Sequence, residues 1–129
     1  MLIKIDFESE NPIYMQLKEQ LIEGIARGEL VAGKTLPSVR QLAEDIGINL
    51  HTVNKTYNIL KVEGYLTVDR RKGAMVNEIP HEYDENKQDE LRRSLSGVLA
   101  QMHCKGIKRE TIDQWIGQDF QGFNQEEGE

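Results

Sequence analysis

Two adjacent segments near the middle of the chain place apolar side chains at the spacing of an α-helix. The first segment has four such positions on one face, Val39, Leu42, Ala43 and Ile46. The second has Val53, Tyr57 and Leu60 on one face, with Thr56 and Ile59 on its flanks. Because residues three and four apart lie on the same side of a helix, this pattern predicts two short helices, each with one buried face.

Residues at the ends of both segments favour the same assignment. Ser38 can accept a hydrogen bond at the start of the first helix, and Gln41 can return it, as in a capping box. Gly47 can adopt the left-handed conformation that ends a helix, and Asn49 can cap the next one. Gly64 is the stop signal of the second helix. The two helices are therefore expected to be joined by a tight turn.

A short hairpin pattern follows these helices. Residues 65–68 and 74–76 have the composition of two strands, and the residues between them are mostly cationic. A helix-turn-helix followed by a hairpin is the arrangement of a winged helix-turn-helix. The sequence therefore predicts a mainly α fold with a small β-wing.

The second helix leaves short polar side chains and one cation outside its apolar face: His51, Thr52, Asn54, Lys55 and Asn58. Such side chains in the first turns of a helix can reach base edges in the major groove of DNA. The alternative interpretation is an ordinary solvated helix face. The glycine turn before this helix and the cationic hairpin tip after it favour DNA binding.

The segment resembles the DNA-binding domain of GntR-family bacterial transcription regulators, from near Pro12 to near Val76. The residues that carry the resemblance are Gly33, Leu36, Pro37, Ser38, Val39, Arg40, Leu42, Ala43, Gly47, Asn49, Thr52, Val53, Lys55, Tyr57, Leu60, Glu63, Gly64 and Gly73. The opening at residues 11–14 and the short C-terminal part are most like the YtrA subfamily. The resemblance implies phosphate or base contacts by Lys34, Ser38 and Arg40, although Arg40 can also be read as an exposed helix arginine.

The expected DNA-binding residues combine those implied by the resemblance with the polar helix face and the wing. They are Lys34, Ser38, Arg40, Asn49, His51, Thr52, Asn54, Lys55, Arg70, Arg71, Lys72 and Gly73. The wing departs from the Arg-Arg-Gly-X-Gly pattern of the family, because Arg71 replaces the first glycine. A positive φ at Arg71 would be strained, so we expect another turn type and an extra cation for phosphate or minor-groove contact.

The N-terminal part is expected to complete this domain. Residues 3–7 alternate apolar and polar, which indicates a short strand or an extended arm. Asn11 is expected to cap a helix whose first position is Pro12 and which stops at Arg27 and Gly28. Four apolar positions give this helix a core face: Ile13, Leu17, Leu21 and Ile25.

The C-terminal part shows two further amphipathic helices, one from Lys87 to the break at Gly106 and one from Lys108 to Phe120. Their apolar positions are Leu91, Leu95, Val98, Leu99, Met102, Ile112, Trp115, Ile116 and Phe120. A helix pair this short cannot bury both of these apolar faces by itself. We therefore expect dimerisation with the same pair of a second subunit. The alternative is packing against the chain's own DNA-binding domain. The predicted divisions are 1–76 DNA-binding domain, 77–86 linker, 87–123 dimerisation module and 124–129 disordered tail.

The net charge is informative only when it is counted separately for each part of the chain. The chain has 129 residues and a net charge of −6, which is unusual for a protein that binds nucleic acid. Residues 34–76, however, carry seven Lys or Arg against four Asp or Glu, whereas residues 81–129 carry six against eleven. The excess of acidic residues therefore lies in the C-terminal module, and the predicted DNA-binding segment is locally basic.

Other functional classes find little support in the residues. The single cysteine, Cys104, excludes an internal disulfide, and neither a signal peptide nor a membrane span is visible, so we expect a cytoplasmic location. The three histidines are widely spaced, and no metal site, cofactor site or catalytic constellation is predicted. We expect a homodimeric, sequence-specific repressor that binds a two-fold symmetric operator on double-stranded DNA. The alternative is a winged-helix adaptor that binds proteins without binding DNA, and the sequence leaves any small-molecule effector undetermined.

Overall fold

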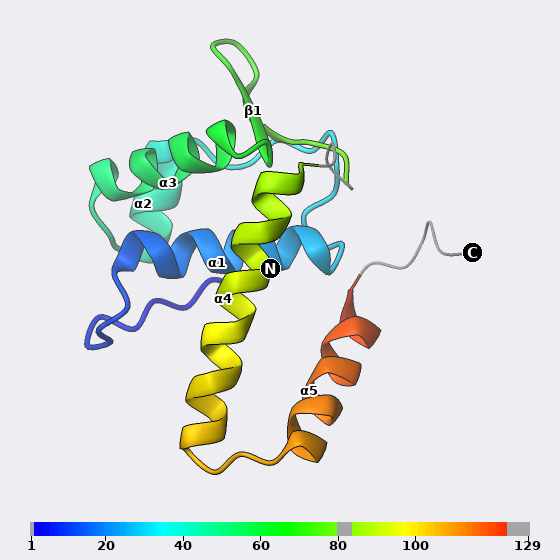
Figure 1. The fold of residues 1–129 in the computed structure, drawn as a ribbon. Coiled ribbons are helices and arrows are strands. Elements are labelled where there is room, and N and C mark those ends of the chain that lie inside the picture. Colours follow the sequence, from blue (N-terminus) through cyan, green and yellow to red (C-terminus); the bar gives the residue numbers. More distant parts are fainter. Residues whose placement is uncertain (1, 80–83, 124–129) are drawn as a thin grey trace. The chain divides into compact units, whose positions relative to one another are not determined.

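The computed structural model describes residues 2–79 and 84–123, which fall into two compact units on either side of the gap. The first unit contains α1 (Ile13–Ala26), α2 (Val39–Ile46), α3 (Leu50–Val62), β1 (Leu66–Asp69) and β2 (Gly73–Val76). The second contains α4 (Glu85–Cys104) and α5 (Arg109–Gly122). Figure 1 shows this order along the chain. The predicted mainly helical fold with a small β-wing is confirmed.

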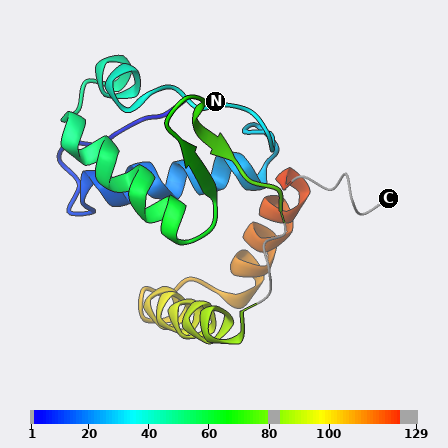
Figure 2. The same cartoon turned by 90° about the horizontal axis from the view of Figure 1, so that it is seen from above.

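The core of the first unit lies between its helices and the hairpin. Both α1 and α2 pack against α3, and the hairpin follows the C-terminal end of α3 (Figures 1 and 2). The buried apolar side chains are Leu17, Leu21, Ile25, Leu36, Leu42, Ala43, Val53, Tyr57, Leu60, Leu66, Ala74 and Val76. Each of the three helical faces predicted for this unit, on α1, α2 and α3, contributes to this cluster.

The caps of α2 and α3 agree with the prediction at three positions. Ser38 Oγ accepts a hydrogen bond of 3.0 Å from the backbone N–H of Gln41. Gly47 has a φ of 70°, and Asn49 Oδ1 accepts a bond of 2.7 Å from the N–H of His51. The prediction that the Gln41 side chain returns a bond to Ser38 is wrong. The Gln41 amide instead donates to Asp45 Oδ1 at 2.7 Å, because that carboxylate lies one turn further along the same helix.

The start of α1 differs from the prediction by one residue. Pro12 is the N-cap, with a ψ of 147°, and Ile13 is the first helical residue. Asn11 does not cap the helix. Its carbonyl accepts a bond of 2.7 Å from the Gln16 amide, and its own amide donates to Glu19 at 3.2 Å. Asn11 therefore joins the preceding chain to α1 through side chains further along the helix.

Residues 2–6 form an extended arm rather than a strand, which decides between the two alternatives. Gln20 bonds both backbone groups of Lys4, accepting from its N–H at 2.9 Å and donating to its carbonyl at 2.5 Å. Gln16 bonds Asp6 in the same way, at 2.9 Å and 3.0 Å. Two glutamines one turn apart on α1 thus bond the backbone N–H and carbonyl groups of the arm, as a neighbouring strand would.

The hairpin is antiparallel, and its register pairs Leu66 with Val76 and Asp69 with Gly73. The segment at residues 33–36 pairs with the other edge of β2. Gly33 N–H donates to the Val76 carbonyl at 2.8 Å, and Leu36 N–H donates to the Ala74 carbonyl at 2.7 Å. This pairing places Lys34 beside the base of the wing.

In the second unit, α4 begins two residues before the predicted Lys87, because Asp84 caps it by accepting from the N–H of Asn86 at 2.9 Å. Gly106 breaks the helices with a φ of 82°, as predicted. No side chain of either helix is buried. Leu91, Leu95, Val98, Trp115, Ile116 and Phe120 are exposed, and Leu99, Met102 and Ile112 are half-buried. Residues 80–83 of the predicted linker and the whole predicted tail, 124–129, lie outside the described residues.

Candidate nucleic-acid interface

The outward face of α3 carries the polar side chains that the sequence singled out. His51, Asn54, Lys55 and Asn58 are exposed, and Thr52 is half-buried. The opposite face is closed by Val53, Tyr57 and Leu60 in the core. The helix therefore presents hydrogen-bonding groups and one ammonium on a rigid, packed backbone.

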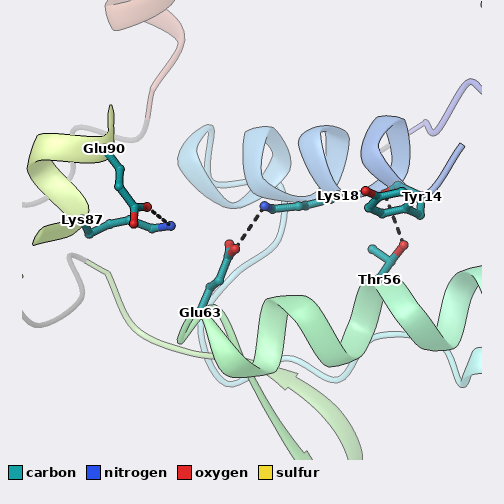
Figure 3. Close-up of polar contacts among 6 residues, drawn as sticks. All are labelled: Tyr14, Lys18, Thr56, Glu63, Lys87 and Glu90. Carbon is teal, nitrogen blue, oxygen red and sulfur yellow. Dashed lines mark hydrogen bonds and ion pairs between the residues drawn. The ribbon is translucent and has the colours of Figure 1, made fainter. Parts of the chain in front are cut away.

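Thr56, predicted to lie on the flank of the apolar face, is a buried polar residue. Its side chain is fully buried, and its hydroxyl lies 3.2 Å from the carbonyl of Tyr14 and 3.0 Å from that of Thr52. The bond to Tyr14 joins α3 to the first turn of α1 (Figure 3). A hydroxyl can enter the core here because two carbonyls lie within bonding distance, one in its own helix and one in α1, and helical spacing cannot reveal the second.

A second bond to a distant backbone group fixes α3 against the start of α2. The hydroxyl of buried Tyr57 donates to the Pro37 carbonyl at 2.8 Å. Burial raises the pKa of Tyr57 from 10.0 to about 12, so the hydroxyl stays protonated and can donate even at moderately alkaline pH. Pro37 immediately precedes the cap residue Ser38, and the bond therefore sets the position of α2 relative to α3.

The C-terminal end of α3 is tied to α1 by an ion pair. Lys18 Nζ lies 3.1 Å from Glu63 Oε2, and both side chains are largely shielded from solvent (Figure 3). Glu63 is the C-cap residue of α3 and Lys18 lies in the middle of α1. Together with the bond from Thr56 to Tyr14, this pair holds α1 and α3 together at two separated points.

Lys55 has an aromatic partner. Its ammonium lies 3.9 Å from the centroid of the Tyr14 ring. This is a cation–π contact between α3 and the first turn of α1. It could not be read from the sequence, because Tyr14 and Lys55 are far apart in the chain.

Three predicted contact residues lie around the two helix starts. Ser38 and Asn49 use their side-chain oxygens as N-caps. Arg40 is exposed and lines a surface hollow with Glu44, Gly47 and Leu50, which puts it beside the turn that leads into α3. The structure therefore brings Arg40 close to the start of the helix that carries His51.

The wing tip is a loop of Arg70, Arg71 and Lys72, all exposed. Asp69 Oδ1 accepts from the N–H of Arg71 at 2.6 Å and from that of Lys72 at 3.1 Å. These bonds hold the pKa of Asp69 below its ordinary value. Among the described residues only glycines have a positive φ, including Gly73 at 81°. The expectation of another turn type is confirmed, and Arg71 is accommodated without strain.

Asn77 is a structural residue of the wing that sequence reasoning missed. Its amide donates to the Gly64 carbonyl at 2.8 Å, and its Oδ1 accepts from the Thr67 hydroxyl at 2.7 Å. Its backbone N–H also donates to the Tyr65 carbonyl at 3.0 Å. One side chain thus joins the end of α3 to β1. The available signal was an asparagine directly after the last strand residue, which is too common to identify this role.

The cations of the candidate surface form no ion pair with the acids that the structure describes. Over residues 2–79 and 84–123, the ion pairs join Lys18 to Glu63, Arg27 to Glu23, Lys87 to Glu90 and Arg109 to Asp113. None of these pairs contains a predicted DNA-binding cation, namely Lys34, Arg40, Lys55, Arg70, Arg71 or Lys72. Their positive charges therefore remain available to an anionic partner such as a phosphate backbone.

Other kinds of site gain no support in the part of the chain that the structure describes. It contains no group of three or more His, Cys, Asp or Glu side chains arranged to hold a metal ion. None of its helices is both long enough and apolar enough to cross a bilayer. Cys104 is a free, exposed thiol.

Comparisons with known proteins agree with this geometry. Residues 13–76 match the family described as "Bacterial regulatory proteins, gntR family". The chain is 34% identical to the HTH-type transcriptional repressor YtrA of Bacillus subtilis, over 89% of each chain. It also resembles the structure of YtrA from Sulfolobus acidocaldarius, a GntR-family transcription factor, with 43% identity and a TM-score of 0.64. That match covers 78% of this chain and 99% of the other.

A further solved structure contains DNA. It is AraR(DBD) in complex with operator ORE1, which is 25% identical, with a TM-score of 0.50 and coverage of 59% of this chain and 93% of that one. The segment that matches the gntR family, residues 13–76, spans α1, α2, α3 and the wing. The chain belongs to the gntR family of bacterial regulatory proteins and is similar to its YtrA members.

Proposed function

We propose that this protein is a homodimeric transcription repressor that binds a two-fold symmetric operator. The observation that carries the proposal is the set of exposed polar and cationic side chains on α3 and the wing tip, whose cations have no acidic partners among the described residues. An operator complex of the related AraR domain supports double-stranded DNA as the ligand. Because bacterial DNA lies in the cytoplasm, the proposal implies a cytoplasmic location.

The proposed contacts divide into two kinds. The first turns of α3 enter the major groove, where His51 and Asn54 contact base edges. Arg40 and the wing cations contact phosphates, with Arg71 as the central residue of the tip. Phosphate contacts position the protein on any DNA, and base contacts select the sequence.

The proposed dimer rests on the apolar faces of α4 and α5. Leu95 is 49% exposed and Phe120 is 59% exposed, and no side chain of either helix is buried within the described chain. Exposed apolar stripes of this kind are costly in water and favour an interface. A second copy offers the same two stripes, and a two-fold dimer needs only one self-complementary surface. The pair would hold two winged domains at a fixed spacing, of the order of 34–36 Å for successive major grooves.

Repression is the simplest regulatory outcome of this architecture. A dimer bound across a promoter excludes polymerase without needing a catalytic or ligand-binding domain. The B. subtilis relative is a repressor, which supports the same direction of control here.

The test is selection of binding sites from random duplex DNA with the full chain, followed by affinity measurements at several salt concentrations. We expect a two-fold symmetric site and an affinity that falls steeply with salt, because the cations release phosphate counterions. Arg71→Ala should weaken binding to all duplexes by a similar factor, whereas Asn54→Ala should change the preferred base at one half-site position. Lys105→Gln, an exposed cation of the second unit, is the matched control and should leave affinity unchanged.

Failure to enrich any sequence, together with a salt slope near zero, would contradict DNA binding and favour an adaptor that binds proteins. Equal weakening of all sites by Arg71→Ala and Asn54→Ala would contradict the separation of base and phosphate contacts. A selected site consisting of a single half-site would contradict the dimer.

A further inference from the structure

We propose that Tyr14 is a positioning residue for DNA binding, whose ring holds the Lys55 ammonium in place on the exposed face of α3. The inference rests on the proposed function, because it concerns how one cation of the candidate interface is ordered before DNA arrives. It assigns a role to a side chain outside the set of predicted DNA-binding residues.

The geometry of the contact supports this role. Lys55 Nζ lies 3.9 Å from the centroid of the Tyr14 ring, well within the limit of about 6 Å for an effective cation–π contact. Lys55 is exposed and Tyr14 is half-buried. The ring is therefore the fixed partner, and the lysine is the one that gains a preferred position.

The backbone beneath the ring is held by the neighbour of Lys55. The hydroxyl of fully buried Thr56 lies 3.2 Å from the carbonyl oxygen of Tyr14 (Figure 3). The Lys18–Glu63 ion pair restrains the same two helices further along. Since both ends of the α1–α3 contact are tied, the backbone that carries the ring cannot move away from residue 55 without breaking a buried hydrogen bond.

The two lysines at this helix contact have different kinds of partner, with different consequences for charge. Lys18 faces the carboxylate of Glu63, which neutralises it. Lys55 faces a ring, and no ion pair of Lys55 occurs among the described residues. A ring attracts the ammonium through its quadrupole without cancelling the net charge. Tyr14 thus restricts a flexible four-carbon side chain and leaves its full positive charge for DNA, which reduces the entropy lost on binding.

The experiment is a double-mutant cycle on the operator obtained by site selection, measured by fluorescence anisotropy. Tyr14→Leu removes the ring, Tyr14→Phe keeps it, and Lys55→Met removes the charge. Tyr14→Leu should weaken binding about two- to five-fold, the effect of an exposed cation–π contact. Tyr14→Phe should stay within about two-fold of the wild type, and Tyr14→Leu should have no further effect when Lys55→Met is present.

A second measurement keeps the test independent of variant folding. In the free wild-type protein, the NMR signals of the Lys55 ε-methylene protons should show the ring-current shift of a group held over an aromatic face. The shift should persist in Tyr14→Phe and disappear in Tyr14→Leu. Its absence from the wild-type protein would overturn the inference even if Tyr14→Leu failed to fold.

The outcomes separate this inference from the proposed function. Equal weakening by Tyr14→Leu with and without Lys55→Met would mean that Tyr14 acts through packing alone, and the inference would be wrong. Weakening by Tyr14→Phe as large as that by Tyr14→Leu would assign the effect to the hydroxyl and also overturn it. A wild-type protein that selects no DNA would overturn both, whereas specific binding with no effect of Tyr14→Leu would overturn this inference alone.

Discussion

Asp69 Oδ1 accepts a hydrogen bond of 2.6 Å from the backbone N–H of Arg71, across the tip of the wing. One carboxylate thus shapes the loop that presents three cations. The acid lies beside the cations but bonds their backbone rather than their side chains, so it orders the loop without occupying the charged groups.

Replacing Asp69 should therefore disorder the tip without unfolding the domain. We expect Asp69→Ala to weaken DNA binding while leaving the thermal midpoint nearly unchanged, because Asp69 is exposed and lies outside the core. Anisotropy titrations and thermal melting would measure the two effects. Thr67→Ala, in the same strand, is a control that removes a bond to Asn77 but leaves the tip intact. A large drop in thermal midpoint for Asp69→Ala would contradict this assignment.

The same bonds predict a pH dependence of the tip. The pKa of Asp69 is lowered by the N–H groups of Arg71 and Lys72, so the carboxylate favours the ordered loop whenever it is ionised. Its contribution is present above the ordinary pKa and is lost as the pH falls through the depressed value, below about pH 4. Amide NMR shifts of Arg71 and Lys72 should follow this titration in the wild type and not in Asp69→Asn. Titration centred above the ordinary aspartate value would contradict the inferred bonds.

Tyr57 predicts a pH dependence in the opposite direction, because its contribution to stability is lost as the pH rises. Burial raises its pKa from 10.0 to about 12, so its contribution to stability is present below pH 10 and is lost as the pH rises through about 12. Denaturant unfolding at pH 7 should show Tyr57→Phe destabilised by about 1–3 kcal/mol, since the Pro37 carbonyl loses its donor. The variant should also lose that part of the alkaline dependence. Identical curves for the two proteins from pH 9 to pH 12 would refute the role of the hydroxyl.

The ion pair between Lys18 and Glu63 should contribute more than an exposed pair. A double-mutant cycle with Lys18→Met and Glu63→Gln should give a coupling free energy of about 0.5–1 kcal/mol, near the upper end for partly exposed pairs. The matched control is Arg109 with Asp113, whose side chains are 87% and 55% exposed and which should couple less. Equal coupling in the two cycles would mean that the shielding of Lys18 and Glu63 adds nothing.

The dimer proposal is tested by placing a charge on the apolar stripe of α4. Leu95→Asp would bury an unpaired carboxylate in the proposed interface, which is costly enough to dissociate a small dimer. Size-exclusion chromatography with light scattering should show a monomer that has lost most of its affinity for a symmetric operator, because the second half-site no longer gains from high effective concentration. Ser94→Asp, at an exposed neighbouring position, should remain dimeric. If a chain truncated after Pro80 stayed dimeric, α4 and α5 would not be the interface.

Local patterns were sufficient to predict the helices and most of their boundaries. Ser38, Gly47 and Asn49 act on atoms within a few residues of themselves, and the structure has all three in their predicted roles. The buried faces of α2 and α3 were likewise predictable, because the period of a helix alone decides which side chains share a side. The exposed face of α3 follows as the complement, so the sequence alone identifies His51, Asn54 and Lys55 as candidates.

Contacts between distant segments were decided only by the tertiary structure. The hydroxyl of fully buried Thr56 has an acceptor in Tyr14, 42 residues away, which helical spacing could not reveal. The ring beside Lys55 and the pairing of residues 33–36 with β2 depend in the same way on which elements meet. Sequence periodicity specifies the face of an element but not the partner that covers it, because that partner is selected by the packing of the whole core.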